Sequence, residues 1–295
     1  MKNRIAAIGT FDGVHRGHRS VLEVMSDYAE KNDMEAVAVT FSRHPLALID
    51  ASRTPAELTP LWKKKKLLQE AGATPLVFEF DEKLRNTESR ELIRELRDNH
   101  GVRALVVGYD NTFGSDGLNM SLDDYRRIGK EEGVEVLTAQ EVKGVSSSAI
   151  RKAVEAGEVE KAGEMLGRPF SITGTVEKGH QLGHTMGFPT ANINPAPETA
   201  IPMNGVYAAI VKTLDDGVKH PAMVYVGTKP TLRRGDALVV ESHLIDWKGD
   251  LYGKPITVRF LKKMRPEKIF DSIDALKRQM NEDLTECRAF FETEQ

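Results

Sequence analysis

The chain has 295 residues, of which 29% are charged and 40% hydrophobic, and its formal net charge is −3. This composition is typical of a folded globular protein, excludes a disordered or fibrous chain, and the length suggests two domains. The lack of a basic excess argues against nucleic-acid binding, and the lack of a long apolar run argues against a membrane span.

Short apolar runs of β type alternate with helical patterns through the first half of the chain. The expected strands are RIAAIG (4–9), AVAVTF (36–41), PLVFEF (75–80), ALVVGYD (104–110) and VEVLTA (134–139). Between the first two strands, HRSVLEVMSDYAEK has one apolar helical face, formed by Val21, Val24, Met25 and Tyr28. This alternation predicts an α/β domain over residues 1–168 with a doubly wound, Rossmann-like parallel sheet, whose ligands bind at the carboxyl ends of the strands.

A run of four lysines occupies residues 63–66 and is followed by LLQEAG. We interpret this run as the solvated start of a helix. A patch that binds nucleic acid is the alternative, and the overall negative charge makes it the weaker one.

After about residue 168 the sequence becomes rich in glycine and proline. Six β-type runs follow: FSITGTVEKG (170–179), TANINP (190–195), GVYAAIVKTL (205–214), PAMVYVG (221–227), ALVVESHLID (237–246) and ITVRFLKK (256–263). Their spacing predicts an antiparallel β-barrel over residues 169–295, with a terminal amphipathic helix from about Pro266. The apolar stripe of that helix is Ile269, Ile273, Leu276, Met280, Leu284 and Cys287.

The only cysteine, Cys287, falls on this stripe, so a packed core thiol is its expected role. A single cysteine cannot form an internal disulfide.

The N-terminal apolar stretch is interrupted by Asp12 and is too short for a signal-peptide core. We therefore expect a cytoplasmic protein.

The first expected strand ends in GTFDGVHRGH, residues 9–18, and a helix follows. Free backbone N–H groups and the helix dipole at such a junction favour a phosphate, and the glycines at 9, 13 and 17 let the backbone come close to it. His15 and His18 lie one helical turn apart and are placed to face the same phosphate. A tight turn with two surface histidines is the alternative.

The HRGH sequence resembles the His-x-Gly-His mark of a nucleotidyltransferase superfamily, whose members attack the α-phosphate of a nucleotide and release pyrophosphate. The short motif also fits pantetheine-phosphate, nicotinate-nucleotide and glycerol-phosphate transfer, and aminoacyl-tRNA synthetases. The full stretch GTFDGVHRGH resembles the bacterial bifunctional riboflavin kinase/FMN adenylyltransferase family, often called FAD synthetase. The resemblance implies that His15 and His18 are catalytic and that four further residues bind nucleotide, namely Gly9, Phe11, Asp12 and Gly17.

A second stretch, VSSSAIR at 145–151, resembles the family's Ile-Ser-Ser-Thr-x-Ile-Arg signature at the start of a helix. Hydroxyl groups and an arginine at a helix start favour an anion, although a plain helix cap with a surface arginine is the alternative. The resemblance implies that the β- and γ-phosphates are held by Ser146, Ser147, Ser148 and Arg151.

VGYDNTFG at 107–114 resembles the family's Gly-x-Asp-Phe-x-Phe-Gly segment, which implies that Asp110 and Phe113 lie near the flavin. Asn111 and Thr112 depart from that pattern. TFSRHP at 40–45 also resembles a family segment, and a turn containing His44 is the alternative.

The second half carries GTVEKGHQLGHTMGFPTANI at 174–193, followed by GVY at 205–207. This arrangement is similar to the riboflavin kinase module. The resemblance implies that Gly179 and Gly183 bind nucleotide and that Thr190 and Asn192 hold Mg²⁺ and the phosphates of ATP. Hydroxyl and amide oxygens are suitable Mg²⁺ ligands. His184 stands where the family often has arginine.

ALVVESHLIDWKGDLYG at 237–253 completes the module. In a strand, Glu241 shares a face with Val239 and His243, so its carboxylate is partly enclosed, as a general base requires. The resemblance implies that Glu241 takes the proton from the ribityl 5′-hydroxyl, whereas a charge on an edge strand is the alternative. MRPEKIF at 264–270 resembles a family segment near the isoalloxazine site, and the resemblance implies a flavin or nucleotide contact for Arg265.

We therefore expect an enzyme with two activities. The C-terminal domain is expected to transfer the γ-phosphoryl group of ATP to riboflavin, and the N-terminal domain to attach AMP from a second ATP to FMN. The implied partners are riboflavin, FMN, ATP and Mg²⁺, and self-association is left open. Two alternatives remain: an enzyme with one activity silenced by the departures at 111, 112 or 184, and a non-catalytic flavin-binding protein.

Overall fold

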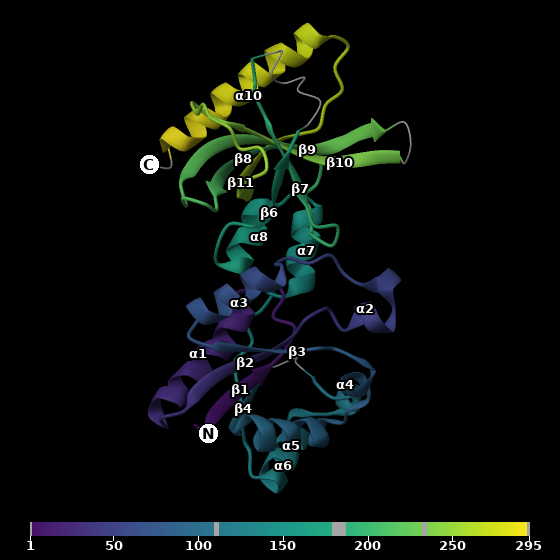
Figure 1. Ribbon diagram of the computed structural model, residues 1–295, viewed down its shortest axis with the longest axis vertical. Helices are drawn as coiled ribbons and strands as arrows, with labels where there is room; N and C mark the ends of the chain where they lie inside the picture. Colours follow the sequence, from purple (N-terminus) through teal and green to yellow (C-terminus); the bar gives the residue numbers. More distant parts are fainter. Residues whose placement is uncertain (1, 109–111, 179–186, 232–234, 294–295) are drawn as a thin grey trace. The chain divides into compact units, whose positions relative to one another are not determined.

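A computed structural model of the chain describes residues 2–108, 112–178, 187–231 and 235–293. The chain forms two compact units, Met1–Ser147 and Ser148–Gln295 (Figure 1). This division comes earlier than the change in sequence character near residue 168. The expected functional boundary between residues 168 and 169 stays a prediction.

The first unit contains a five-stranded parallel sheet. Its strands are β1 (Arg4–Ile8), β2 (Glu35–Phe41), β3 (Thr74–Phe78), β4 (Val102–Val107) and β5 (Glu135–Thr138). They lie in the order β3-β2-β1-β4-β5, and every neighbouring pair is parallel. The predicted doubly wound sheet is confirmed. Its winding reverses between β1 and β4, so the carboxyl ends of these two strands form the crevice in which ligands of such sheets bind.

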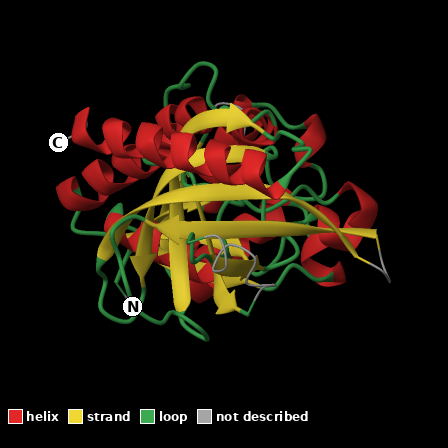
Figure 2. Ribbon diagram, turned by 90° about the horizontal axis from the view of Figure 1, so that it is seen from above, coloured by secondary structure: helices red, strands yellow, loops and turns green. Residues whose placement is uncertain are grey.

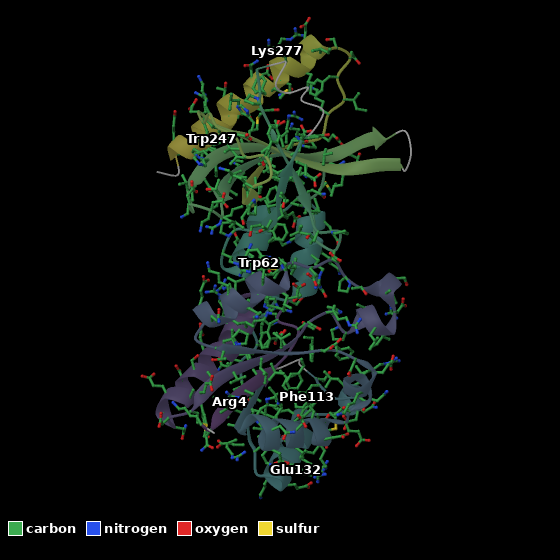
Figure 3. The ribbon with its side chains drawn as sticks, viewed as in Figure 1. Arg4, Trp62, Phe113, Glu132, Trp247 and Lys277 are labelled. Atoms are coloured by element: carbon green, nitrogen blue, oxygen red, sulfur yellow. The ribbon has the colours of Figure 1, made fainter. Side chains whose placement is uncertain are left out.

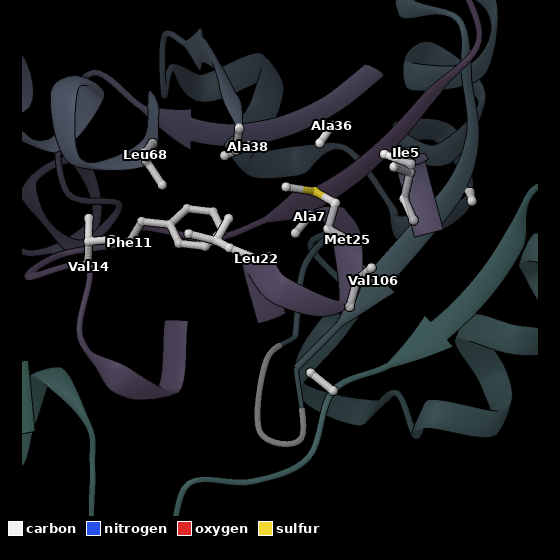
Figure 4. Close-up of a cluster of buried hydrophobic side chains, with 14 of the residues drawn as sticks. Ile5, Ala7, Phe11, Val14, Leu22, Met25, Ala36, Ala38, Leu68 and Val106 are labelled. Carbon is white, nitrogen blue, oxygen red and sulfur yellow. The ribbon is translucent and has the colours of Figure 1, made fainter. Parts of the chain in front are cut away.

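Helices cover both faces of this sheet. They are α1 (Arg16–Lys31), α2 (Leu46–Ile49), α3 (Leu61–Glu70), α4 (Glu82–Asn86), α5 (Ser89–His100) and α6 (Leu122–Glu132), with 3₁₀ turns η1 (Ala51–Arg53) and η2 (Gly117–Asn119). Side chains alternate along β1, so Ile5 joins the core cluster under α1 and α3 while Ala6 joins the cluster under α5 and α6. Figure 4 shows the first cluster, where the ring of Phe11 lies beside Leu22.

The buried residues of α1 are Leu22, Met25 and Ala29, whereas Val21, Val24 and Tyr28 are only partly buried. The predicted face is therefore rotated from the one that packs on the sheet. The apolar stripe of α1 is broad enough to contain both sets, and Met25, which belongs to both, lies near its centre.

The second unit contains a closed antiparallel barrel. Its strands are β6 (Ser171–Glu177), β7 (Ala191–Pro195), β8 (Gly205–Thr213), β9 (Lys219–Thr231), β10 (Gly235–Leu244) and β11 (Pro255–Pro266). The order around the barrel is β10-β7-β6-β11-β8-β9. The predicted barrel and its terminal helix are both confirmed.

The terminal helix α10 (Ile273–Thr293) lies along the barrel and contacts β8, β9 and β11 (Figures 1 and 2). It begins later than the expected Pro266, because β11 continues to that residue. The Oγ of Ser272 accepts a hydrogen bond of 3.2 Å from the backbone N–H of Ala275, as an N-cap does. No helix in the described part of the chain is long and apolar enough to span a membrane.

Cys287 is fully buried between α10 and the barrel, beside Val206 and Met223. Burial raises the pKa of its thiol to about 12. The expected core thiol is confirmed, but the start of the predicted stripe is not buried. Ile269 precedes α10 and is 92% exposed.

Helix α8 (Val159–Leu166) packs on β11 of the barrel. It follows α7 (Ser147–Glu155), in which the carbonyl of Val154 accepts a hydrogen bond of 3.2 Å from the N–H of Met203, just before β8. The buried residues of α8 are Val159, Ala162, Met165 and Leu166. At the connection between the helices, Gly157 has a φ of +74°, and a Cβ there would lie 2.9 Å from the hydroxyl of Tyr207. The barrel therefore approaches this turn too closely for any larger residue.

One acidic side chain connects α6 to α5. The carboxylate of Glu132, labelled in Figure 3, is only 6% exposed and lies within 2.8 Å of Arg90 and Arg94 and 3.1 Å of Arg97. The hydrogen bond from Arg94 lowers the pKa of Glu132 most, burial opposes this, and Arg90 lowers it further, to about 2. Because this pKa is depressed in the folded state, the contribution to stability is present above the ordinary value of 4.5 and is lost as the pH falls towards 2.

We predict that Glu132→Gln lowers the melting temperature of the first unit at pH 7, and that its difference from wild type narrows as the pH falls below about 4.5. Thermal unfolding followed by circular dichroism over a pH series measures this difference. Glu131→Gln is the control, because Glu131 is 45% exposed and its pairs lie in solvent. A difference independent of pH, or an equal loss in the control, would contradict the assignment.

Candidate active sites

The loop between β1 and α1 is held in a constrained shape. Phe11 has a φ of +48° and Val14 a φ of +39°, in the left-handed region that non-glycine residues rarely occupy. The N–H of Gly9 donates to the carbonyl of Val39 at 3.0 Å, and the N–H of Val14 donates to the carbonyl of Phe11 at 3.1 Å. The first bond extends the pairing of β1 with β2, and the second closes a turn before α1 begins.

His15 is the N-cap of α1, and its Nδ1 accepts a hydrogen bond from the N–H of His18 at 3.2 Å. The neutral His15 ring must therefore carry its proton on Nε2, from which it can donate to an anion. The two imidazoles stack with centroids 3.6 Å apart. A Cβ on Gly17 would lie 3.2 Å from the His15 ring, so the glycine leaves room for this stack.

Phe11 and Asp12 both point into the protein. Phe11 is 2% exposed and meets the His18 ring edge-on at 5.2 Å. Asp12 is 6% exposed, and its carboxylate accepts backbone hydrogen bonds of 3.1 Å from Leu58 and Thr59. Their side chains thus fix the loop that carries the histidines, and their expected contacts with nucleotide stay predictions.

The serine-rich segment meets this loop through one hydroxyl. The Oγ of Ser147 donates to the carbonyl of Asp12 at 2.9 Å. Ser147 is also the first residue of α7, so Ser148 and Arg151 follow it within the same helix. Arg151 is 9% exposed and Ser146 is partly buried. The structure thus brings Ser147 to the histidine loop, and the anion contacts expected for the serines and Arg151 stay predictions.

The predicted flavin segment is only partly described, since Asp110 and Asn111 lie outside the described residues. Phe113 is 8% exposed and packs on Tyr125 with ring centroids 4.5 Å apart. The hydroxyl of Tyr125 accepts from the N–H of Phe113 and donates to its carbonyl. Thr112 is exposed. Sequence reasoning missed Tyr125, whose only signal was its place on the apolar face of α6.

His44 follows the turn interpretation. Its Nδ1 accepts a hydrogen bond of 3.2 Å from the N–H of Leu46, two residues later. Together with Thr10, Asp12 and Lys64, it lines a small cleft at the carboxyl ends of β1 and β2.

In the barrel, the strand register places the predicted kinase residues side by side. Glu241 on β10 lies directly opposite Asn192 on β7 and opposite Tyr225 on β9. Directly opposed residues share a face, with Cβ atoms about 4.5–5.5 Å apart. Glu241 and Asn192 are both partly buried. Three further predicted positions, Gly179, Gly183 and His184, lie outside the described residues.

A cavity of about 480 Å³ opens beside Thr190, and its lining includes Ala191 and Leu244 but neither Glu241 nor Asn192. Its walls include Trp247, labelled in Figure 3, and Tyr252. The carbonyl of Pro189 lies 2.9 Å from Nδ1 of His243, so β10 holds the segment that carries Thr190. Trp247 and Tyr252 follow Glu241 in the stretch that resembles the kinase module, but the sequence analysis predicts no cavity or ligand contact for them.

Arg265 and Glu267, near the end of β11, already have partners within the second unit. Arg265 binds Asp283 of α10 through two hydrogen bonds of 2.7 Å, and Asp283 is 2% exposed. The flavin contact expected for Arg265 stays a prediction. The hydroxyl of Tyr225 donates to Glu267, and burial, this hydrogen bond and the charge of Glu267 raise the pKa of Tyr225.

No cluster of three or more His, Cys, Asp or Glu side chains in the described segments is arranged to hold a metal ion. A Mg²⁺ ion bound together with nucleotide needs few protein ligands, because phosphates and water supply the rest. The oxygens of Thr190, Asn192 and Glu241 are of the kind that Mg²⁺ prefers. The donor set of the barrel therefore fits a Mg²⁺·ATP complex.

Comparison with known proteins also divides the chain into two parts. The FAD synthetase family model matches residues 1–152 and the riboflavin kinase family model matches residues 166–291. The chain is 37% identical to the bifunctional riboflavin kinase/FMN adenylyltransferase of Escherichia coli K12, covering 97% of this chain and 92% of that protein. Identity to the Bacillus subtilis 168 protein of the same name is 33%, with the same coverage.

A solved structure described as a macrolide-efflux protein from Streptococcus pneumoniae matches with a TM-score of 0.88 at 28% identity, covering 97% of this chain and 94% of that one. The same two-unit fold is therefore present in a protein with a different description. Since both family models match and the curated relatives align over nearly the whole chain, this protein belongs to the bifunctional riboflavin kinase/FMN adenylyltransferase family.

Proposed function

We propose that the two reactions of this enzyme, phosphorylation of riboflavin to FMN and adenylylation of FMN to FAD, take place at the two sites described above. The opposed barrel residues Asn192, Glu241 and Tyr225 serve the first reaction, and the loop that carries His15 and His18 serves the second. The observation that carries the kinase assignment is the register that sets Glu241 opposite Asn192, two residues after Thr190, which lines a cavity. We do not extend macrolide efflux to this chain, because both family models and the curated relatives describe flavin synthesis.

In the kinase reaction, Glu241 accepts the proton of the ribityl 5′-hydroxyl. The alcohol oxygen then forms a bond to the γ-phosphorus of ATP, while the bond to the β-phosphate oxygen breaks and ADP leaves. A partly buried carboxylate on a rigid strand suits this role, because its position is set by the register and not by a loop.

Thr190 and Asn192 are proposed to hold the phosphates and Mg²⁺. The ion, when bound, neutralises charge on the transferred phosphoryl group. His243 keeps the backbone at Pro189 in place, and this fixes the start of the segment that carries both residues. The cavity walls at Trp247 and Tyr252 are suited to an aromatic base.

In the adenylyl reaction, a phosphate oxygen of FMN attacks the α-phosphorus of ATP and pyrophosphate leaves. The attacking group is already an anion at neutral pH, so the site needs no general base, and catalysis depends on positioning and charge stabilisation. His15 donates from Nε2, and the N-terminus of α1 adds its positive potential. Ser146, Ser147, Ser148 and Arg151 are proposed to hold the leaving pyrophosphate.

The proposal includes a cytoplasmic location, where ATP is available, and no nucleic-acid partner, in keeping with the net charge of −3. An enzyme with one silenced activity is the remaining alternative, since Asn111, Thr112 and His184 depart from the family pattern. Measuring each half-reaction separately distinguishes it.

We predict that Glu241→Gln abolishes FMN formation from riboflavin, with a loss of at least about 10²-fold for removal of the base. FAD formation from supplied FMN should remain near the wild-type rate. Incubation with ATP and Mg²⁺, followed by chromatography of the flavins, measures both. Glu177→Gln is the matched control, because Glu177 opposes Asn192 from the other neighbouring strand. Equal loss in this control would refute the base assignment.

We predict the reverse for His18→Ala. FAD formation from FMN should fall by about 10²–10³-fold, as on removal of a single charge-stabilising group, and FMN should accumulate from riboflavin. The same chromatographic assay measures both products. His100→Ala at the end of α5 is the control. Normal FAD synthesis by His18→Ala would show that the histidine loop is not the adenylyl site.

A further inference from the structure

One lysine of the run at residues 63–66 faces the protein interior. Lys64 lies three and four residues before Leu67 and Leu68, which are the buried residues of α3, so it shares their helical face. It is partly buried, as is Lys63, whereas Lys65 and Lys66 are exposed. The expected solvated helix start is therefore wrong for Lys64, whose ammonium group binds backbone carbonyls.

The ammonium group of Lys64 binds the backbone beside the histidine loop. Its Nζ donates to the carbonyl of Thr10 at 2.9 Å and lies 3.5 Å from the carbonyl of Phe41. These carbonyls follow β1 and end β2, two neighbouring parallel strands. Lys64 thus connects the carboxyl ends of both strands at the edge of the sheet where ligands bind.

Keeping a charge at this position has a cost that its surroundings offset. Burial lowers the pKa of Lys64, and the negative charges of Asp12 and Glu57 raise it. Asp12 is itself fixed by the backbone N–H groups of Leu58 and Thr59, just before α3. The lysine and the aspartate therefore hold α3 and the loop against each other from opposite sides.

The carbonyl that Lys64 binds belongs to the residue before the first strained position. Thr10 precedes Phe11, whose φ is +48°. The same carbonyl also accepts a hydrogen bond of 3.0 Å from Oγ1 of Thr40, which is fully buried. A strained loop conformation persists only where its surroundings determine it, and these two donors do so at its entrance.

We propose that Lys64 is a positioning residue for adenylyl transfer. Its ammonium holds the carbonyls of Thr10 and Phe41, and this sets the backbone that carries His15 and His18. Lys64 acts through the loop and does not contact the nucleotide. The inference rests on the proposed function of the histidine loop.

The test compares three variants of the full-length enzyme by FAD formation from FMN, ATP and Mg²⁺. Lys64→Met keeps the apolar stem and removes the donors and the charge. We expect its kcat to fall on the order of 10- to 100-fold, as for a displaced catalytic loop, with KM for ATP changed less than about 3-fold. Lys64→Arg keeps donors and charge and should retain clearly more activity. Lys65→Met is the matched control and should behave as wild type.

A wild-type kcat in Lys64→Met would overturn the proposal, as would Lys64→Arg being no better than Lys64→Met. A loss expressed mainly in KM for ATP would also overturn it, because it would mean that Lys64 contacts the nucleotide directly. FMN formation by the same preparations reports on the barrel unit. The His18→Ala variant tests the proposed function separately. If His18→Ala keeps its FAD-forming activity, the proposed adenylyl site is wrong. If His18→Ala loses this activity and Lys64→Met keeps it, only the positioning role of Lys64 is wrong.

Lys64→Met can also fail to fold, which thermal unfolding would reveal. In that case Thr40→Val is the deciding variant, because it removes the other donor to the Thr10 carbonyl and leaves the charge of Lys64 in place. A lower kcat with unchanged KM for ATP supports the proposal that the position of this carbonyl controls adenylyl transfer. A wild-type kcat in Thr40→Val overturns that proposal.

Discussion

Left-handed backbone angles at Phe11 and Val14 make the turn from β1 into α1 energetically costly, and the proposed adenylyl site depends on that turn. The turn brings His15 to the N-cap of α1, where one of its ring nitrogens is already occupied by the N–H of His18. Buried side chains and hydrogen bonds from neighbouring elements keep the turn in this shape. The first unit is therefore a frame that holds one short backbone segment in a geometry that the segment would not adopt alone.

The barrel places its chemistry in a different way. No strained loop is needed to bring Glu241 and Asn192 together, because hydrogen bonding between β7 and β10 fixes which residues are opposed. A slip of one residue in this register would move the carboxylate to the other face of the sheet. Antiparallel pairing thus sets the geometry of the proposed kinase site, whereas the ends of parallel strands set that of the proposed adenylyl site.

Strong local patterns made most of this architecture predictable, since alternation, glycine spacing and the HRGH sequence are properties of neighbouring residues. Features set by distant parts of the chain were not predictable. Phe11 next to a phosphate motif fits a ligand contact and a core contact equally well, and only the fold shows that its side chain is buried. The pairing of Arg265 with Asp283 joins a strand to a helix that follows a loop. The inward position of Lys64 could have been predicted, because Lys64 shares a helical face with Leu67 and Leu68. The four consecutive lysines instead favoured a solvent-exposed helix start.

The two compact units do not separate at the place where the sequence changes character. Helix α8 precedes that change, yet it packs against β11 of the barrel. A fragment that began at residue 169 would leave bare the strand surface that Val159, Ala162 and Leu166 normally cover. A fragment that began at residue 148 would keep this cover but would remove Ser147 from the helix it begins. The two helices therefore have different roles: α7 begins with Ser147, whose hydroxyl donates to the histidine loop, whereas α8 covers part of the barrel.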